Sequence, residues 1–181
     1  MSRLLLAVAL LCLSPPGWAG LCEDPAGTTV YLVRHAEKQD GPDPVLTEAG
    51  EARAIALRDR LAGIPLDAIY STQWQRTRLT AEPVARARNL PIHIRSTESR
   101  SVTEHVQDVV DDLIEEHCGQ TVLVVGHSNT IPHIVGGLTG QVMEDLDERD
   151  YDLLYQVWIG PDRPAEMLRT RFGAVNRAEM P

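Results

Sequence analysis

The chain is 181 residues long, and 43% of its residues are hydrophobic. This length predicts a single domain with a full hydrophobic core that needs no disulfide or metal staple. Its 26 acidic residues outnumber 17 lysines and arginines, which gives a formal net charge of −9. An acidic chain with no basic cluster argues against nucleic acid or an anionic membrane surface as a partner.

The first residues have the pattern of a secretory signal peptide. Arg3 supplies a positive charge, residues 4–13 are apolar, and residues 17–19 (Gly-Trp-Ala) give a small-x-small cleavage pattern. The apolar run is much shorter than the ~20 residues that a membrane-spanning helix needs. We therefore expect a signal peptide over residues 1–19 and one exported domain over residues 20–181, periplasmic or secreted, with no membrane span in the mature chain.

Two cysteines remain after the signal peptide, Cys22 and Cys118. An even pair of cysteines in an exported protein suggests a disulfide bond. Two buried free thiols are the alternative. A lipid anchor on Cys22 is a third interpretation, although Leu21 stands before it where a small residue is expected.

From Thr28 onward, strand-like and helix-like segments alternate along the chain. Thr47 can cap a helix, and Ser101 with Glu104 forms a capping-box pattern that opens another. Strands are expected at residues 28–33, 67–71, 91–95, 121–126, 153–159 and 165–172, and helices at residues 47–62, 75–88, 101–117 and 129–138. The turn residues 160–162 (Gly-Pro-Asp) join the last two strands as an antiparallel hairpin. This order predicts an α/β fold, a three-layer α/β/α sandwich with a mostly parallel sheet and a C-terminal antiparallel hairpin.

Two of the expected strands lead into a histidine. An apolar Val-Tyr-Leu-Val run ends at Arg34 and His35, and a second apolar run ends at His127. A short strand between them is followed by Arg76 and Arg78. Ligands of open α/β sheets bind where the parallel strands end. Two histidines and at least two arginines at one sheet edge therefore indicate a phosphate site that contains a nucleophile.

Four motifs, in the same order along the chain, resemble those of the histidine phosphatase superfamily. Residues 34–36 (Arg-His-Ala) resemble the family's Arg-His-Gly/Ala signature, and residues 46–50 (Leu-Thr-Glu-Ala-Gly) resemble the segment that opens its first helix. Residues 71–82 resemble the segment with the second catalytic arginine, and residues 125–130 the segment with the second histidine. The resemblance runs from about residue 28 to about residue 159 and implies the family's fold and a phosphohistidine mechanism.

The resemblance implies roles for the residues at these positions. His35 is expected to be the nucleophile that forms the phosphohistidine. Arg34 and Arg76 are expected to clamp the phosphoryl oxygens, to which His127 would also hydrogen-bond. Arg78 is the rival of Arg76 but lacks the register of the motif. We expect the flanking arginines to lower the pKa of the nucleophile, because like charge disfavours the imidazolium.

Three further residues are predicted to contact the substrate: Lys38, Ser128 and Asn129. A solvated surface charge is the alternative interpretation of Lys38.

The acid that protonates a leaving alkoxide is less clearly marked. Glu98, in the loop after the third strand, is the first candidate because that loop lies at the expected edge of the sheet. Glu104 is the second candidate, although its capping-box pattern is a sufficient structural explanation. Glu37 is close to the nucleophile in sequence but is more typical of an ion pair or a substrate contact.

The family's fold also bears on the expected disulfide. In that fold the strands that end at His35 and His127 are parallel neighbours. Cys22 and Cys118 precede these strands, so both are expected at the sheet edge opposite the active site. Neighbouring strands lie ~4.8 Å apart, within the ~4.4–6.8 Å Cα separation that a disulfide tolerates.

The predicted function is hydrolysis of a phosphomonoester through a phosphohistidine intermediate. The expected partner is a small phosphorylated substrate, with no metal and no organic cofactor, and the chain is expected to be a monomer or a weak homodimer. A phosphosugar mutase is the alternative within the family. An exported phospholigand-binding module without turnover is the alternative from another class of protein.

Two other chemistries have weaker patterns. Residues 126–130 (Gly-His-Ser-Asn-Thr) come within one residue of the G-x-S-x-G elbow of serine hydrolases, but Thr130 stands where glycine is needed. A metal site built from His35, His127 and His133 lacks a third liganding cluster with recognisable spacing.

Overall fold

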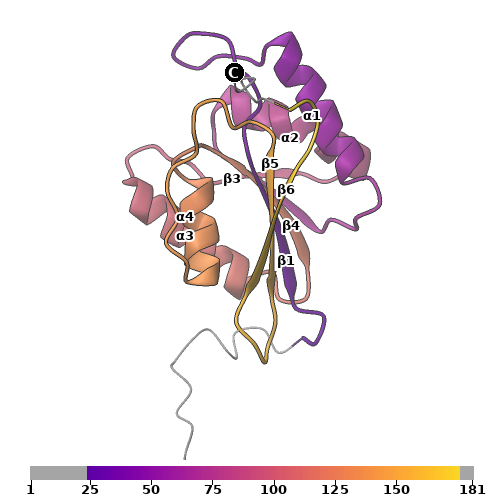
Figure 1. Ribbon diagram of the computed structural model, residues 1–181, viewed down its shortest axis with the longest axis vertical. Coiled ribbons are helices and arrows are strands. Elements are labelled where there is room, and N and C mark those ends of the chain that lie inside the picture. The colour runs from indigo at the N-terminus through magenta and orange to yellow at the C-terminus, as the bar shows by residue number, and fades with distance from the viewer. Residues whose placement is uncertain (1–23, 176–181) are drawn as a thin grey trace, which may run out of the picture.

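The computed structural model describes residues 24–175, which fold around one six-stranded sheet (Figure 1). The strand order across the sheet is β3-β2-β4-β1-β5-β6. The strands are β1 (Thr28–Arg34), β2 (Ala68–Ser71), β3 (Ile92–Ile94), β4 (Thr121–Gly126), β5 (Leu153–Ile159) and β6 (Glu166–Arg171).

Strands β3, β2, β4 and β1 run parallel, whereas β5 and β6 add an antiparallel hairpin. The expected mostly parallel sheet with a C-terminal hairpin is therefore confirmed. In the β1–β4 pair, Arg34 lies opposite Gly126, so the two strands end level with each other. This register brings the residues that follow both strands to the same point of the sheet edge.

Four helices cover the two faces of the sheet. Figure 1 shows α1 and α2 together on one side and α3 and α4 on the other. The helices are α1 (Glu48–Arg60), α2 (Gln75–Arg88), α3 (Val102–Glu115) and α4 (Ile131–Thr139). This is the expected three-layer α/β/α sandwich.

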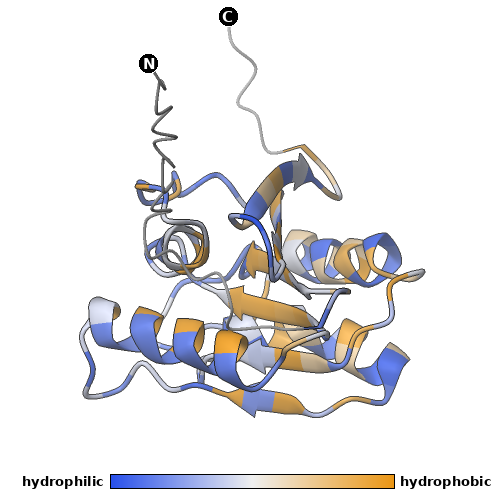
Figure 2. Cartoon of the chain, turned by 90° about the horizontal axis from the view of Figure 1, so that it is seen from below, coloured by the Kyte–Doolittle hydropathy of each residue, from blue (hydrophilic) through white to orange (hydrophobic). Residues whose placement is uncertain are grey.

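The central strands are apolar on both faces because each face packs against a helical layer. Val30 and Leu32 of β1 belong to the core under α3 and α4, whereas Tyr31 and Val33 belong to the core under α1 and α2. Residues that alternate along a strand point to opposite faces of the sheet. Figure 2 shows the resulting pattern, with hydrophobic strands in the interior and hydrophilic residues on the outer sides of the helices.

Local sequence signals account for most of the helix boundaries. The Thr47 side chain accepts a hydrogen bond from the Gly50 backbone N–H (3.2 Å), as an N-cap does. Ser101 and Glu104 form the expected capping box at the start of α3. Helices α1 and α3 end two residues before the expected positions, and α4 begins two residues later. These differences fall in the terminal turns, where propensity is least decisive.

Some expectations concern residues outside the described range. The signal peptide over residues 1–19 and Cys22 lie there, so export, lipidation and the Cys22–Cys118 disulfide stay predictions. Cys118 lies between α3 and β4, at the end of the sheet away from the strand ends that carry the histidines. Within residues 24–175, no helix is long and apolar enough to cross a membrane.

Gly50 illustrates how tightly α1 packs against the segment that follows β1. A Cβ atom at Gly50 would lie 2.0 Å from the backbone oxygen of Glu37, which is far inside van der Waals contact. That oxygen also accepts a hydrogen bond from the Thr47 backbone N–H (3.0 Å), so it is held in place. The glycine of the Leu-Thr-Glu-Ala-Gly segment is therefore needed for close approach of two backbones.

We predict that Gly50→Ala destabilises the fold, since a backbone oxygen cannot move aside as a flexible side chain can. Overpacking of this kind costs about 1–3 kcal/mol, which outweighs the ~1 kcal/mol by which alanine favours a helix. Gly63→Ala is the matched control, because no atom lies within 4 Å of the added Cβ. Urea unfolding of the two variants should separate them, and equal stabilities would contradict this account of the packing.

Candidate active site

The sheet edge at the ends of β1 and β4 brings His35 and His127 together. The backbone N–H of His35 donates to the oxygen of Gly126 (2.9 Å), which extends the β1–β4 pairing by one residue. The two imidazole ring centroids lie 5.5 Å apart, and the rings meet edge to face. Both side chains are almost fully buried, at 3% and 8% exposure. The convergence expected from the two strand ends is therefore present.

The hydrogen bonds of His35 determine which ring nitrogen can attack. Nδ1 lies 2.8 Å from the backbone oxygen of Ala36, which can only accept, so Nδ1 carries the proton and donates it. Nε2 of the neutral ring is left with a free lone pair. Burial, together with the nearby charges of Arg34 and Arg76, lowers the pKa of His35 to about 3. The imidazole is thus neutral at ordinary pH, as a nucleophile must be.

Ala36 is itself fixed by α2. Its backbone N–H donates to Oγ1 of Thr80 (2.9 Å), and that hydroxyl donates to the backbone oxygen of Arg76 (2.7 Å). This short chain of hydrogen bonds links the nucleophile's loop to the helix turn that carries Arg76.

A second chain of hydrogen bonds fixes the tautomer of His127. Nη2 of Arg76 lies 3.5 Å from Nδ1 of His127, and because arginine can only donate, Nδ1 accepts. Nε2 therefore carries the proton and donates to Oγ1 of Thr72 (3.0 Å), which in turn donates to Oγ1 of Thr77 (2.8 Å). Thr77 completes the chain by donating to the backbone oxygen of Trp74 (2.8 Å). Burial lowers the pKa of His127 to about 3, with His35 and Arg76 adding to the effect.

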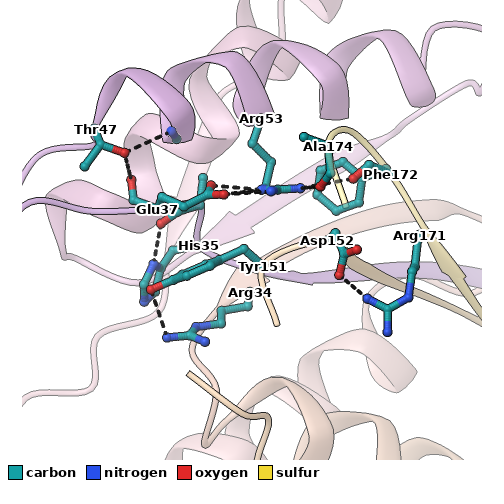
Figure 3. A network of polar contacts seen from close by, with 12 residues as sticks. Arg34, His35, Glu37, Thr47, Arg53, Tyr151, Asp152, Arg171, Phe172 and Ala174 are labelled. Carbon is teal, nitrogen blue, oxygen red and sulfur yellow. Dashed lines mark hydrogen bonds and ion pairs between the residues drawn. The ribbon is translucent and has the colours of Figure 1, made fainter. Parts of the chain in front are cut away.

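Residues of the connector that precedes β5 hold the side chain of Arg34 in place. Its guanidinium stacks over the ring of Tyr151, with 4.2 Å between the guanidinium carbon and the ring centroid. Nη1 donates to the backbone oxygen of Asp147 (2.9 Å), and Nη2 lies 3.5 Å from the Tyr151 hydroxyl. Figure 3 shows Tyr151 lying beside both Arg34 and His35. No sequence pattern pointed to Tyr151, because a lone aromatic residue in an acidic connector has no distinguishing feature.

Both guanidiniums keep a donor available. The Nε atoms of Arg34 and Arg76 are buried and have no hydrogen-bond partner among the described residues. Arg34 is buried and Arg76 is half-buried, so burial lowers the pKa of each guanidinium. A buried donor that has no hydrogen-bond partner lowers the stability of the fold unless an acceptor binds to it. Their arrangement therefore suits an anionic ligand with several oxygens.

These side chains line a cavity of about 500 Å³. Seven of its fourteen lining residues were expected from the sequence: Arg34, His35, Lys38, Arg76, His127, Ser128 and Asn129. The cavity is also lined by Trp74, Thr97, Arg100 and His105, to which no sequence pattern pointed. Four of the lining side chains are cationic, and none carries a carboxylate. Arg78, the rival of Arg76, is exposed and does not line the cavity.

The three acids considered as proton donors all lie away from the cavity lining. Glu98 is exposed, and its backbone N–H donates to Oγ of Ser96 (3.1 Å). Glu104 is held by the capping box with Ser101, which lowers the pKa of its carboxyl. Glu37 forms a buried ion pair with Arg53 (2.6 Å; Figure 3). The geometry therefore gives none of these acids a place beside the reacting atoms, and the assignment of Glu98 stays a prediction without structural support.

His133, the third histidine of the metal-site alternative, lies outside the cavity lining. It pairs with Asp145 (2.8 Å), and its side chain is 41% exposed. Among residues 24–175, no group of three or more histidine, cysteine, aspartate or glutamate side chains is arranged to hold a metal ion.

The cationic cavity beside the parallel strand ends suits an anionic ligand, and comparison with known proteins shows which family the chain resembles. Residues 30–98 match the family model of the histidine phosphatase superfamily (branch 1). Phosphoserine phosphatase 1 of Hydrogenobacter thermophilus is 42% identical over 71 residues, which are 35% of this chain and 34% of the relative. The aligned segment thus spans about a third of that curated protein.

Solved structures share the fold over nearly their whole length. A phosphoserine phosphatase from Entamoeba histolytica, in complex with 3-phosphoglyceric acid, is 17% identical with a TM-score of 0.60, covering 82% of this chain and 98% of that one. The protein histidine phosphatase SixA, with tungstate, is 18% identical with a TM-score of 0.62, covering 79% and 96%. A putative α-ribazole-5'-P phosphatase from Escherichia coli is 18% identical with a TM-score of 0.64, covering 80% and 96%. The matched segment and the shared fold make the chain similar to proteins of the histidine phosphatase superfamily.

The burial of His35 and His127 predicts that the protein loses stability as the pH falls. Each has a pKa of about 3 when folded, against ~6.5 for an exposed histidine, so only the unfolded chain takes up these protons between about pH 6 and pH 4. For each histidine, the free energy of unfolding then falls by up to about 1.4 kcal/mol per pH unit. Urea unfolding at pH 7, 6 and 5 should give a shallower pH slope for His127→Asn than for the wild type.

His133→Asn, at the partly exposed position outside the cavity, controls for the loss of a histidine as such. Identical slopes for the wild type and His127→Asn would show that His127 is not buried in its neutral form.

Proposed function

We propose that the protein hydrolyses a small phosphomonoester through a phosphohistidine on His35. The observation that carries this proposal is the pairing of a neutral His35, with its Nε2 lone pair free, and two arginines whose buried Nε donors have no partner among the described residues. Phosphoryl transfer depends mainly on positioning and charge stabilisation, which this arrangement supplies.

The reaction would have two steps. In the first step Nε2 of His35 bonds to phosphorus while the bond to the leaving oxygen breaks. In the second step a water oxygen bonds to phosphorus, and the electron pair of the breaking P–N bond returns to Nε2. Arg34 and Arg76 would bind the equatorial oxygens in both steps, because planar guanidiniums grip phosphate oxygens in pairs.

His127 would join the clamp once an anion is bound. In the free protein its Nδ1 accepts from Arg76 and has no proton to donate. A phosphoryl dianion beside the ring favours the imidazolium, and the added proton on Nδ1 could then be donated to a phosphoryl oxygen. Phosphate binding would therefore be accompanied by proton uptake.

The relatives support a phosphatase rather than a binding module. Proteins named phosphoserine phosphatase, protein histidine phosphatase and α-ribazole-5'-P phosphatase share this fold or a segment of this sequence. A module that only binds phospholigands has no need for a nucleophile with its tautomer fixed. A cavity of about 500 Å³ suits a small phosphorylated substrate, and the predicted signal peptide would place that substrate outside the cytoplasm.

The decisive experiment removes the nucleophile. His35→Ala should lower turnover of an aryl phosphate to background while circular dichroism shows an intact fold. Arg76→Ala should keep the nucleophile but reduce kcat by about 10²–10³-fold, as loss of one stabilising donor usually does. The assay compares these variants with the wild type under substrate saturation.

Arg78→Ala and Ser128→Ala serve as controls. Arg78 is exposed and outside the cavity, so its loss should leave kcat unchanged. Ser128→Ala should retain turnover, since a serine nucleophile is not required. Near-wild-type activity of His35→Ala would refute the proposal, and tight phosphate binding by a wild type that shows no turnover would favour the binding module.

A further inference from the structure

His105 is a buried histidine of the cavity that the proposed steps leave without a role. It lies in the first turn of α3, is 3% exposed, and lines the same cavity as His35 and His127. The capping box of Ser101 and Glu104 fixes the turn that carries it.

The second step of the reaction needs a group that takes a proton from water. The described cavity lining offers no carboxylate for this purpose. His35 is occupied by the phosphoryl group in that step, and His127 belongs to the proposed clamp, with its Nε2 donating to Thr72. His105 is the histidine of the lining that remains.

The burial of His105 suits a base. A neutral imidazole carries one ring N–H and keeps a lone pair on its other nitrogen, which can accept a proton. Burial lowers the pKa of His105, with a smaller contribution from Arg100. The ring is therefore neutral and able to accept a proton.

His105 also stands between two cavities. A second cavity of about 450 Å³ adjoins the first and shares His105 and Arg100 with it. Asp108, Asp111 and Asp112 line this second cavity. A proton taken up on the phosphate side could therefore leave toward carboxylates without passing the buried cations of the clamp.

We propose that His105 is the general base that activates water for hydrolysis of the phosphohistidine. The water proton passes to the free ring nitrogen of His105 while the water oxygen bonds to phosphorus and the P–N bond to His35 breaks. The proton then leaves His105 for solvent, which restores the neutral ring. This inference rests on the proposed function, because it requires a phosphoenzyme.

Rapid-quench kinetics with an aryl phosphate separate the two steps, because the aryl leaving group needs no proton. In His105→Gln, the phosphoenzyme should form at the wild-type rate, whereas its hydrolysis should slow by about 10²–10⁴-fold, the usual contribution of a general base. Phosphoenzyme should therefore accumulate in the variant. Added imidazole should restore hydrolysis in His105→Ala, which a purely structural role of the side chain would not allow.

His133→Ala is the matched control and should hydrolyse its phosphoenzyme at the wild-type rate, because this side chain does not line the cavity. Wild-type hydrolysis in His105→Gln would overturn the inference and leave the proposed function standing. Equal loss of both steps without imidazole rescue would also overturn it, by showing a structural role. A wild type that forms no phosphoenzyme would overturn the proposed function together with the inference.

Discussion

The site depends on positive charge that is gathered at one edge of the sheet. The described cavity lining holds no carboxylate that would neutralise it. Arg34 and Arg76 are partly removed from water, and each keeps a buried Nε donor unpaired. Acidic residues of the 147–150 connector offset part of this charge from outside the lining. A buried cationic cavity of this kind is complementary to an anion with several oxygens, and its electrostatics favour a neutral over a charged histidine.

The surrounding fold maintains this arrangement through contacts to backbone atoms. Two parallel strands that end level place the histidines, and the carbonyl of Ala36 sets the tautomer of His35. Thr72, which precedes α2, contacts the ring of His127 and is held by Thr77 of that helix. Tyr151 supports Arg34 from the far end of the chain. Because most of these partners are backbone groups or hydroxyls, they orient the site without adding negative charge that would compete with a phosphoryl group.

The sequence predicted the parts of the site that follow from strand ends and known motifs. We could predict His35, His127 and the two arginines because apolar runs end beside or shortly before them. The local spacing of Ser101 and Glu104 also predicted the capping box. Tyr151, Thr72 and His105 were missed, because their contacts join segments far apart in the chain and carry no local pattern. Glu98 was chosen for its loop, but the direction in which a loop side chain points is set by tertiary packing.

The most direct test is to locate the phosphoryl group on the protein. The wild type is mixed with an aryl phosphate, quenched in base, digested and examined by mass spectrometry and ³¹P NMR. The hydrogen bond from Nδ1 of His35 to Ala36 predicts phosphorylation of His35 at Nε2. Phosphate found on Ser128, on His127 or on Nδ1 of His35 would contradict this account of the site.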